Sequence, residues 1–163
     1  MNNEFDVVII GAGLAGLQCA RLLARDTSVL LVDLKRDLTK GVHTTGIFVR
    51  KTFEDFEFPP GTLGRPISDV TLYSPRLRTM EISSAVPEFR VGRMGALYSE
   101  YLKDCINNGV EFAGGTKYVR SRAHEKGTVV ELERNGVRFE VRAKVLVGAD
   151  GSASRVARDL GLD

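Results

Sequence analysis

The residues best suited to chemistry are three glycines near the N-terminus, Gly11, Gly13 and Gly16, in the spacing G-x-G-x-x-G. They follow a short apolar run and open a stretch in which small and apolar residues recur at helical spacing. In such a turn the first glycine allows the reversal, the second lets the backbone approach a pyrophosphate, and the third lets the helix lie close to the sheet. The N–H groups at the helix start would bind the phosphates. We therefore expect a nucleotide to bind at Gly11, Ala12, Gly13, Leu14, Ala15 and Gly16.

An acidic residue, Asp33, ends the next apolar run, at residues 29–33. A carboxylate at this position can accept hydrogen bonds from both hydroxyls of an adenosine ribose. It would also repel a 2′-phosphate, which favours a nucleotide with a free 2′-hydroxyl. Leu34 and Lys35 follow it and are expected to line the same site. For Lys35 and its neighbour Arg36, a solvated loop is the alternative. A glycine-rich turn that binds no ligand is the alternative for the whole unit.

A second strand, turn and helix occur near the end of the chain. Residues 143–147 form an apolar run, Asp150 and Gly151 follow it, and helical spacing resumes from Arg155. Asp150 thus lies at the carboxyl end of a strand, the edge at which open α/β sheets bind their ligands. Capping of the last helix is another role for Asp150, and it is compatible with ligand binding.

The stretch between these motifs predicts the rest of the fold. A helix at 94–107 ends at Asn108–Gly109 and leads to a third parallel strand at 110–112. Three segments in which apolar and polar residues alternate follow, at 118–122, 128–133 and 137–142. Asn135–Gly136 joins the last two as a hairpin turn. The sequence therefore predicts an α/β fold, a Rossmann-like parallel sheet with an antiparallel β-meander.

Residues 37–69 show no sustained periodicity, and so long a stretch usually covers a site. Near its start, residues 41–46 include two glycines and two threonines, small and hydroxyl residues that would let the backbone approach a ring system. Thr45 and Gly46 are therefore candidate cofactor contacts. His43 could donate a proton, but a surface or packing role is its more usual alternative.

Two groups of apolar side chains in this part of the chain are expected to be buried against another surface. Phe48, Phe53, Phe56 and Phe58 lie close together in sequence and call for a partner surface. Residues 70–82 alternate apolar and polar on either side of a Ser-Pro turn, which predicts a hairpin with one wet and one covered face.

Composition narrows the function classes. The 163 residues carry a formal net charge of +2 without a basic cluster, so nucleic acid is not an expected partner. Cys19 and Cys105 suit buried thiols in a reducing compartment rather than a metal site. The apolar N-terminus has no basic segment before it and is broken by glycines, so we expect a cytoplasmic protein without an integral membrane segment.

Taken together, the motifs resemble a known family. The glycine turn with Asp33, Arg93 before the helix at 94, and the segment 148–155 resemble the FAD-binding half of the para-hydroxybenzoate hydroxylase superfamily, most of all its geranylgeranyl reductase branch. The meander resembles the glutathione-reductase-type FAD-binding fold. The resemblance implies that FAD binds with its ADP part at the glycine turn. It also implies that Arg93 reaches the phosphate and ribityl region and that Asp150 lies near the flavin diphosphate.

The resemblance implies a reaction but no particular catalytic residue. NAD(P)H would reduce the flavin, which would pass hydride to a C=C bond of a small hydrophobic substrate. A flavin-dependent monooxygenase and a non-catalytic nucleotide-binding module are the alternatives. Two departures are that Asp33 stands where the family usually has Glu, and that residues 42–45 lack the cysteine often found in the reductase branch.

The resemblance also implies a domain organisation. Residues 1–163 would be a truncated FAD-binding domain, and 62–90 an insertion belonging to an incomplete substrate-binding sheet, as a partial substrate-domain hairpin. We expect the missing C-terminal half or another chain to cover residues 48–82. On this basis the chain alone should hold FAD weakly and be inactive.

Overall fold

A computed structural model describes residues 3–162, and the chain divides into two compact units. The first unit comprises Met1–Lys40 and Tyr98–Asp163, and the second comprises Gly41–Leu97. None of the helices within residues 3–162 is long and apolar enough to cross a membrane.

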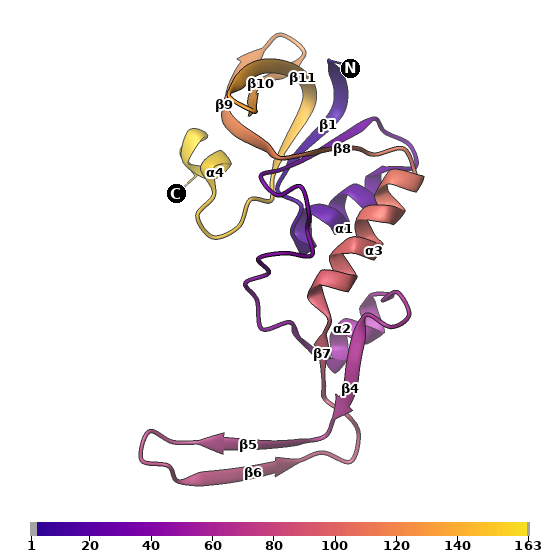
Figure 1. Cartoon of the computed structure of the whole chain (residues 1–163), viewed down its shortest axis with the longest axis vertical. Coiled ribbons are helices and arrows are strands. Elements are labelled where there is room, and N and C mark those ends of the chain that lie inside the picture. The colour runs from indigo at the N-terminus through magenta and orange to yellow at the C-terminus, as the bar shows by residue number, and fades with distance from the viewer. Residues whose placement is uncertain (1–2, 163) are drawn as a thin grey trace. The chain divides into compact units, whose positions relative to one another are not determined.

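A six-stranded sheet is the centre of the first unit (Figure 1). Its strands, in spatial order, are β8 (Glu111–Gly114), β2 (Val29–Asp33), β1 (Glu4–Ile10), β11 (Val137–Gly148), β10 (Gly127–Arg134) and β9 (Thr116–His124). The pairs β8–β2, β2–β1 and β1–β11 are parallel, and β11–β10 and β10–β9 are antiparallel. The predicted parallel sheet with an antiparallel meander is confirmed.

Strand β11 corrects one detail of the prediction. The segments 137–142 and 143–147, expected as two strands, form a single strand of 12 residues. Its first part pairs antiparallel with β10, and its second part pairs parallel with β1 from Arg142 onward. No turn-forming residue separates the two parts, so the chain continues without a break. The predicted turn before it is present, because Asn135 and Gly136 have φ angles of +53° and +78°, as a type I′ hairpin requires.

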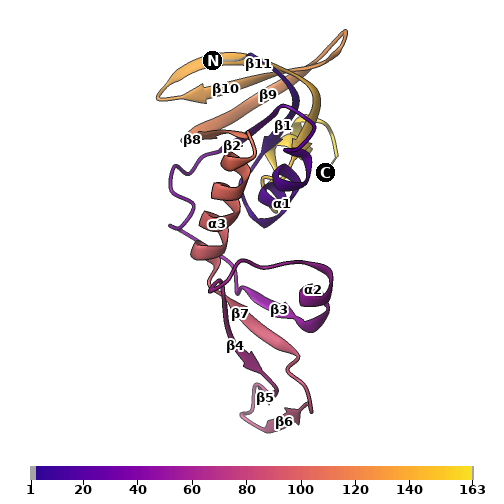
Figure 2. The same cartoon turned by 90° about the vertical axis from the view of Figure 1, so that its right-hand side faces the viewer.

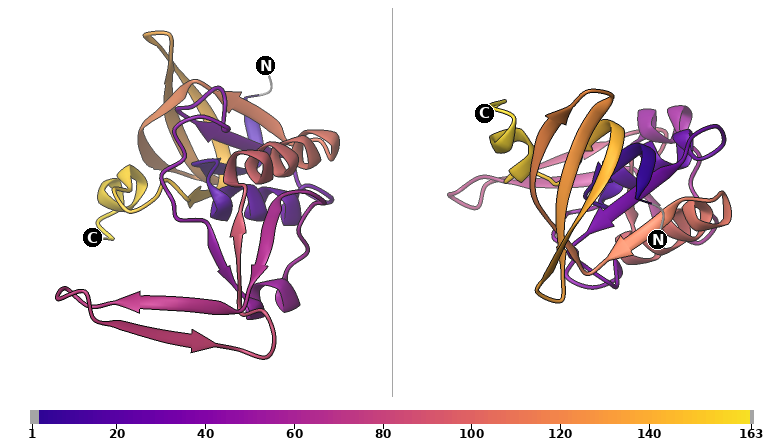
Figure 3. Two further views of the ribbon diagram at one scale, coloured as in Figure 1. Left: turned by 60° about the horizontal axis from the view of Figure 1, so that its bottom comes forward. Right: turned by 90° about the horizontal axis from the view of Figure 1, so that it is seen from above.

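The sheet encloses its own core on one face. Buried side chains of the parallel strands meet buried side chains of the meander, namely Val8, Ile10, Leu30 and Val32 with Tyr118, Val130, Leu132 and Val141. Figure 3 shows how β9, β10 and β11 curl to reach this position. The alternate residues Ile9 and Leu31 on the opposite face are also fully buried. Both faces of β1 and β2 are therefore covered, as β-branched and apolar runs of this kind require.

Helices α1 (Leu14–Leu23) and α3 (Met94–Asn107) contact one another. The Arg21 guanidinium lies 4.1 Å from the ring centre of Tyr101 and 2.6 Å from the Asp104 carboxylate. The buried stripe of α3 is Leu97, Tyr101 and Cys105, whereas Tyr98 and Leu102 are only half-buried. Both pairs of large side chains recur every four residues, as on one face of a helix, so the sequence pattern alone does not distinguish the two faces.

The end of α3 is as predicted. Gly109 has a φ angle of +91°, and the N–H groups of Gly109 and Val110 donate to the carbonyls of Ile106 and Cys105. This is the hydrogen-bond pattern of a Schellman motif, in which glycine occupies the left-handed position.

The second unit has regular structure where none was predicted. Strands β3 (Ile47–Val49), β7 (Phe89–Gly92) and β4 (Leu63–Ile67) form a sheet in that order, with α2 (Arg50–Asp55) after β3 (Figure 2). The expectation that residues 37–69 lack regular elements is therefore wrong. The elements there span only three to six residues, too few to reveal a period.

The phenylalanines also differ from expectation. Phe48, Phe53 and Phe58 contact one another edge-to-face, with ring centres 5.0 to 6.4 Å apart. Phe48 is 9% exposed, whereas Phe56 is 48% exposed. Three of the four rings thus form a small core of their own, and only Phe56 lacks such cover.

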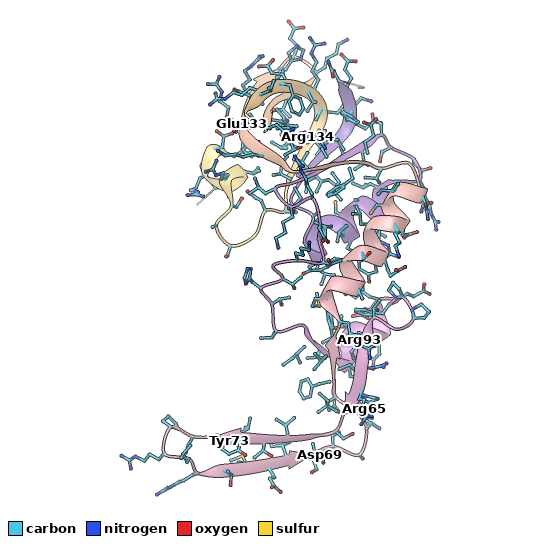
Figure 4. The ribbon with its side chains drawn as sticks, in the orientation of Figure 1. Arg65, Asp69, Tyr73, Arg93, Glu133 and Arg134 are labelled. Carbon is cyan, nitrogen blue, oxygen red and sulfur yellow. The ribbon has the colours of Figure 1, made fainter. Side chains whose placement is uncertain are left out.

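The predicted hairpin is present as β5 (Asp69–Tyr73) and β6 (Thr79–Ser83). Val70 pairs with Ile82 and Leu72 with Met80, which gathers the apolar side chains on one face. Asp69 and Tyr73, labelled in Figure 4, alternate with these residues along β5. Leu72 and Met80 are 48% and 62% exposed, so the face expected to be covered is open to solvent within the described residues.

The last helix, α4 (Arg155–Asp159), is fixed to β9 by one carboxylate oxygen. Oδ2 of Asp159 accepts hydrogen bonds from the Tyr118 hydroxyl, the Ser121 hydroxyl at 2.9 Å and the Ser121 N–H at 2.7 Å. The bond from Tyr118 is the largest of the interactions that hold the pKa of Asp159 below its ordinary value of 3.8. Burial, followed by the same bond, raises the pKa of Tyr118.

This cluster predicts a pH dependence of stability. A carboxylate whose pKa is lowered on folding stabilises the protein above its unfolded pKa, and this contribution is lost as the pH falls through the folded pKa. We expect the unfolding free energy to fall as the pH is lowered below about 4, and Asp159→Asn to be less stable at pH 7 and less sensitive to acid. Urea unfolding at pH 7 and pH 3 measures both. An unchanged acid sensitivity in the variant would contradict this role of Asp159.

Candidate nucleotide-binding site

The glycine turn is enclosed between two strand ends. The Gly11 N–H donates to the Val32 carbonyl at 2.8 Å, and the Ala149 N–H donates to the Ile10 carbonyl at 2.7 Å. Gly11 has a φ angle of +102°, and a Cβ atom on it would lie 2.3 Å from the Ala149 oxygen. Only glycine satisfies both constraints. The two turns predicted at this sheet edge, after β1 and after β11, are therefore in direct contact.

Gly16 and Gly13 differ in what surrounds them. A Cβ atom on Gly16 would lie 1.8 Å from the Gly11 oxygen, whereas one on Gly13 would meet nothing within 4 Å. Packing within the chain thus explains Gly16 but not Gly13. Gly13 is also the N-cap of α1 and makes no side-chain capping hydrogen bond. The first N–H groups of α1 are left for an acceptor from outside the helix, which is the arrangement that binds phosphates.

Asp33 ties this turn to the end of β2. Its Oδ2 accepts a hydrogen bond from the Ala12 N–H at 2.7 Å, and its Oδ1 accepts one from the Lys35 N–H at 2.7 Å. An ionised carboxylate has about four acceptor positions, so each oxygen can accept one more hydrogen bond. Leu34 is 69% exposed and Lys35 is also exposed, beside this carboxylate. The geometry fits a ligand that presents two hydroxyls to Asp33.

Asp150 organises the turn after β11. Its Oδ1 accepts from the Ser154 hydroxyl at 2.5 Å, and its Oδ2 accepts from the N–H groups of Arg155 at 2.6 Å and Val156 at 3.3 Å. The N-cap of α4 is Ser154, not Asp150. Burial raises the pKa of Asp150, but these hydrogen bonds outweigh it and the pKa lies below its ordinary value. Gly151, with a φ angle of +84° and open space around it, continues the turn.

The remaining candidate cofactor contacts, Thr45, Gly46 and Arg93, lie in the second unit. The Gly92 N–H donates to the Gly46 carbonyl at 2.6 Å, which brings Thr45 and Gly46 beside Arg93 (Arg93 is labelled in Figure 4). Arg93 directly precedes α3, and its N–H donates to the Thr62 carbonyl at 2.7 Å. Its exposed guanidinium lies 3.4 Å from the Gly61 carbonyl oxygen. These three residues form one group. His43 is exposed, and no hydrogen bond or ion pair with another of the residues 3–162 assigns its side chain a role.

Sequence reasoning missed two contributors to the first unit's site. Ala149 forms the wall against which Gly11 and Gly16 pack, and its short side chain is the only indication in the sequence. Arg36 donates from Nη2 to Oδ1 of Asn135 at 2.7 Å, a contact between residues 99 positions apart. Nothing local in the sequence could have indicated that pairing.

A hollow of about 310 Å³ lies elsewhere in the first unit, on the outer side of the meander. Its charged lining residues are already paired, Arg122 with Glu140 at 3.0 Å and Arg142 with Glu4 at 2.9 Å. It includes none of the candidate nucleotide contacts.

The family model for pyridine nucleotide-disulphide oxidoreductases matches residues 5–162. The chain belongs to this family. It is 29% identical over 171 residues to an uncharacterized protein in the nifH2 5′ region of Methanosarcina barkeri, covering 98% of this chain and 89% of that protein. It is 27% identical to the digeranylgeranylglycerophospholipid reductase of Methanosarcina acetivorans, covering 100% of this chain and 42% of the reductase. The chain thus spans about two-fifths of the curated reductases that it matches.

Two solved structures have the same fold over nearly all of this chain. A geranylgeranyl bacteriochlorophyll reductase-like protein from Thermoplasma acidophilum matches all of this chain and 43% of its own, with a TM-score of 0.87 and 16% identity. CabE, an aromatic hydroxylase from angucycline biosynthesis, matches 98% of this chain and 33% of its own, with a TM-score of 0.77 and 20% identity. The predicted resemblance to the geranylgeranyl reductase branch is confirmed.

Gly13 and Gly16 provide a matched pair of variants that tests the packing of the glycine turn. Gly16→Ala would push the Gly11 carbonyl oxygen away from the start of α1. It should lower the unfolding free energy by about 1–3 kcal/mol. Gly13→Ala meets no atom and should change it by less than about 1 kcal/mol. Urea unfolding of both variants measures the difference. Equal losses would show that the close approach at Gly16 does not control the turn.

Proposed function

We propose that this chain is the FAD-binding part of an NAD(P)H-linked flavoprotein oxidoreductase of the geranylgeranyl reductase type. The reaction would be hydride transfer to a C=C bond of a hydrophobic substrate. The observation that carries the proposal is the uncapped start of α1 beside Asp33, with open space at Gly13. The names of the curated relatives, which are reductases of a geranylgeranylated glycerophospholipid, support the substrate class.

The residues of the first unit fit the ADP part of FAD. The N–H groups after Gly13 would hold the diphosphate, and Asp33 would accept the two ribose hydroxyls while still holding Ala12 and Lys35. Leu34 would line the adenosine side. When bound, FAD supplies two-electron transfer between a nicotinamide and the substrate, and the protein orients it.

Five residues are proposed for the flavin end. Asp150 and Gly151 would lie by the flavin diphosphate, because their turn packs against the glycine turn. Arg93 would bind a phosphate or ribityl oxygen through its exposed guanidinium, and Thr45 and Gly46 would bring backbone close to the ring. An arginine at a helix start is unfavourable beside the helix dipole, so an anion partner is the better explanation for Arg93.

We infer a role in substrate binding for residues 62–90. The hairpin within this segment presents an apolar face that the described residues leave open. A substrate-binding sheet, supplied by a further segment as in the longer relatives or by another chain, would cover it. The 42% coverage of the reductases is consistent with such an arrangement.

A flavin-dependent monooxygenase is the second candidate. It is favoured by the fold match to aromatic hydroxylases, including aklavinone-11 hydroxylase solved with FAD and aklavinone, at a TM-score of 0.72 and 24% identity. Its reduced flavin would react with oxygen rather than with a double bond of the substrate.

Anaerobic titration separates the candidates. With excess FAD, we expect weak binding that ADP competes away, because the first unit holds the ADP end. Bleaching of bound flavin by NADPH or NADH would support an oxidoreductase, and fast reoxidation by air with hydroxylation of an added aromatic would favour the monooxygenase. Bound FAD that is never bleached, even when the further segment found in the longer relatives is supplied, would favour a non-catalytic module. No competition by ADP would contradict the assigned site.

Replacement of Asp33 tests the nucleotide assignment. Asp33→Ala should weaken FAD binding by about 1.5–3 kcal/mol, because hydrogen bonds to a charged acceptor are lost. Asp33→Asn, which keeps one acceptor oxygen, should lose less. Fluorescence titration with FAD and with NADP gives both affinities, and urea unfolding controls for loss of the Ala12 and Lys35 contacts. NADP bound more tightly than FAD by the wild type would overturn the assignment.

A further inference from the structure

The contact between Arg36 and Asn135 closes one side of the loop that follows Asp33. Arg36 Nη2 donates to the Asn135 side-chain oxygen at 2.7 Å. The loop after Asp33 lies against two glycines, Gly114 at the end of β8 and Gly115 between β8 and β9. A Cβ atom on Gly114 would lie 3.1 Å from the Lys35 oxygen, and one on Gly115 only 2.5 Å from Arg36 Nε. The absence of side chains at these two positions lets the Arg36 side chain lie across the start of β9.

The position of Asn135 is set by the meander and not by a flexible loop. Asn135 is the first of the two central residues of the type I′ turn between β10 and β11, and it has a φ angle of +53°. Its neighbour Arg134, labelled in Figure 4, pairs in register with Thr116, the first residue of β9. The hairpin tip is therefore held beside Gly115, and its amide oxygen is a fixed acceptor for the guanidinium.

Arg36 lies three residues after the carboxylate proposed to bind the ribose. An arginine near this position is the usual means by which a dinucleotide fold accommodates a 2′-phosphate, which a guanidinium binds with two parallel hydrogen bonds. While it donates to Asn135 through Nη2, the Arg36 guanidinium is tethered to the tip of the meander, and that N–H group is not free for a 2′-phosphate. Asp33 adds charge repulsion against the same phosphate.

We propose that Asn135 is a positioning residue that makes the site select adenosine with a free 2′-hydroxyl, because it holds the Arg36 guanidinium away from a 2′-phosphate. The inference rests on the proposed function, in that the nucleotide ribose is taken to bind at Asp33. It adds a determinant from the meander to a site otherwise built from the glycine turn and β2.

Calorimetric titration of the full chain with ADP-ribose and with 2′-phospho-ADP-ribose tests this. Asn135→Gly keeps the left-handed turn and removes the acceptor. It should tighten binding of the 2′-phosphate about threefold to tenfold, the effect of one net hydrogen bond, and should change ADP-ribose less than about twofold. Removing Arg36 as well, in Arg36→Ala with Asn135→Gly, should abolish the gain.

Two controls make the outcome specific. Asn135→Asp retains an acceptor and should keep the wild-type preference. Arg122→Ala removes an exposed arginine paired with Glu140 on the outer side of the meander, and it should leave both affinities unchanged. An Asn135→Gly variant with an unchanged affinity ratio would overturn the proposal. If the wild type bound neither ADP-ribose nor FAD, the proposed function itself would fail, and that result needs no variant.

Discussion

Two backbone turns approach each other so closely that one of them must carry glycine at the point of contact. A Cβ atom on Gly11 would lie 2.3 Å from the Ala149 oxygen, and one on Gly16 would lie 1.8 Å from the Gly11 oxygen in the same turn. The turns follow β1 and β11, which pair in parallel, so they must leave the sheet at the same edge. This contact sets where α1 begins, and therefore where its free N–H groups lie.

The features suited to a nucleotide follow from that placement. Because α1 starts at Gly13 without a capping side chain, its amides need an acceptor from elsewhere, and the space at Gly13 is open. Asp33 holds the same turn through Ala12 and keeps acceptor capacity for a ribose. Asp150 orders the opposing turn by binding amides at the start of α4. Each carboxylate thus has a structural partner as well as a proposed ligand.

Much of this arrangement could be predicted from sequence because its determinants are local. The glycine spacing, the acid at the end of β2 and the Asn135–Gly136 turn each specify a short segment, and the structure has them where expected. What could not be predicted depends on distant pairing. The continuity of β11 across two partners and the contact of Arg36 with Asn135 have no periodic or local pattern.

The central claim is that the ADP part of FAD binds at the start of α1 and at Asp33. Amide chemical shifts of the isotope-labelled chain, followed during a titration with ADP, test it most directly. The account predicts the largest changes at Gly13, Leu14, Ala15 and Lys35, with none at Arg122 on the outer side of the meander. Changes confined to other residues, or no change at saturating ADP, would contradict it.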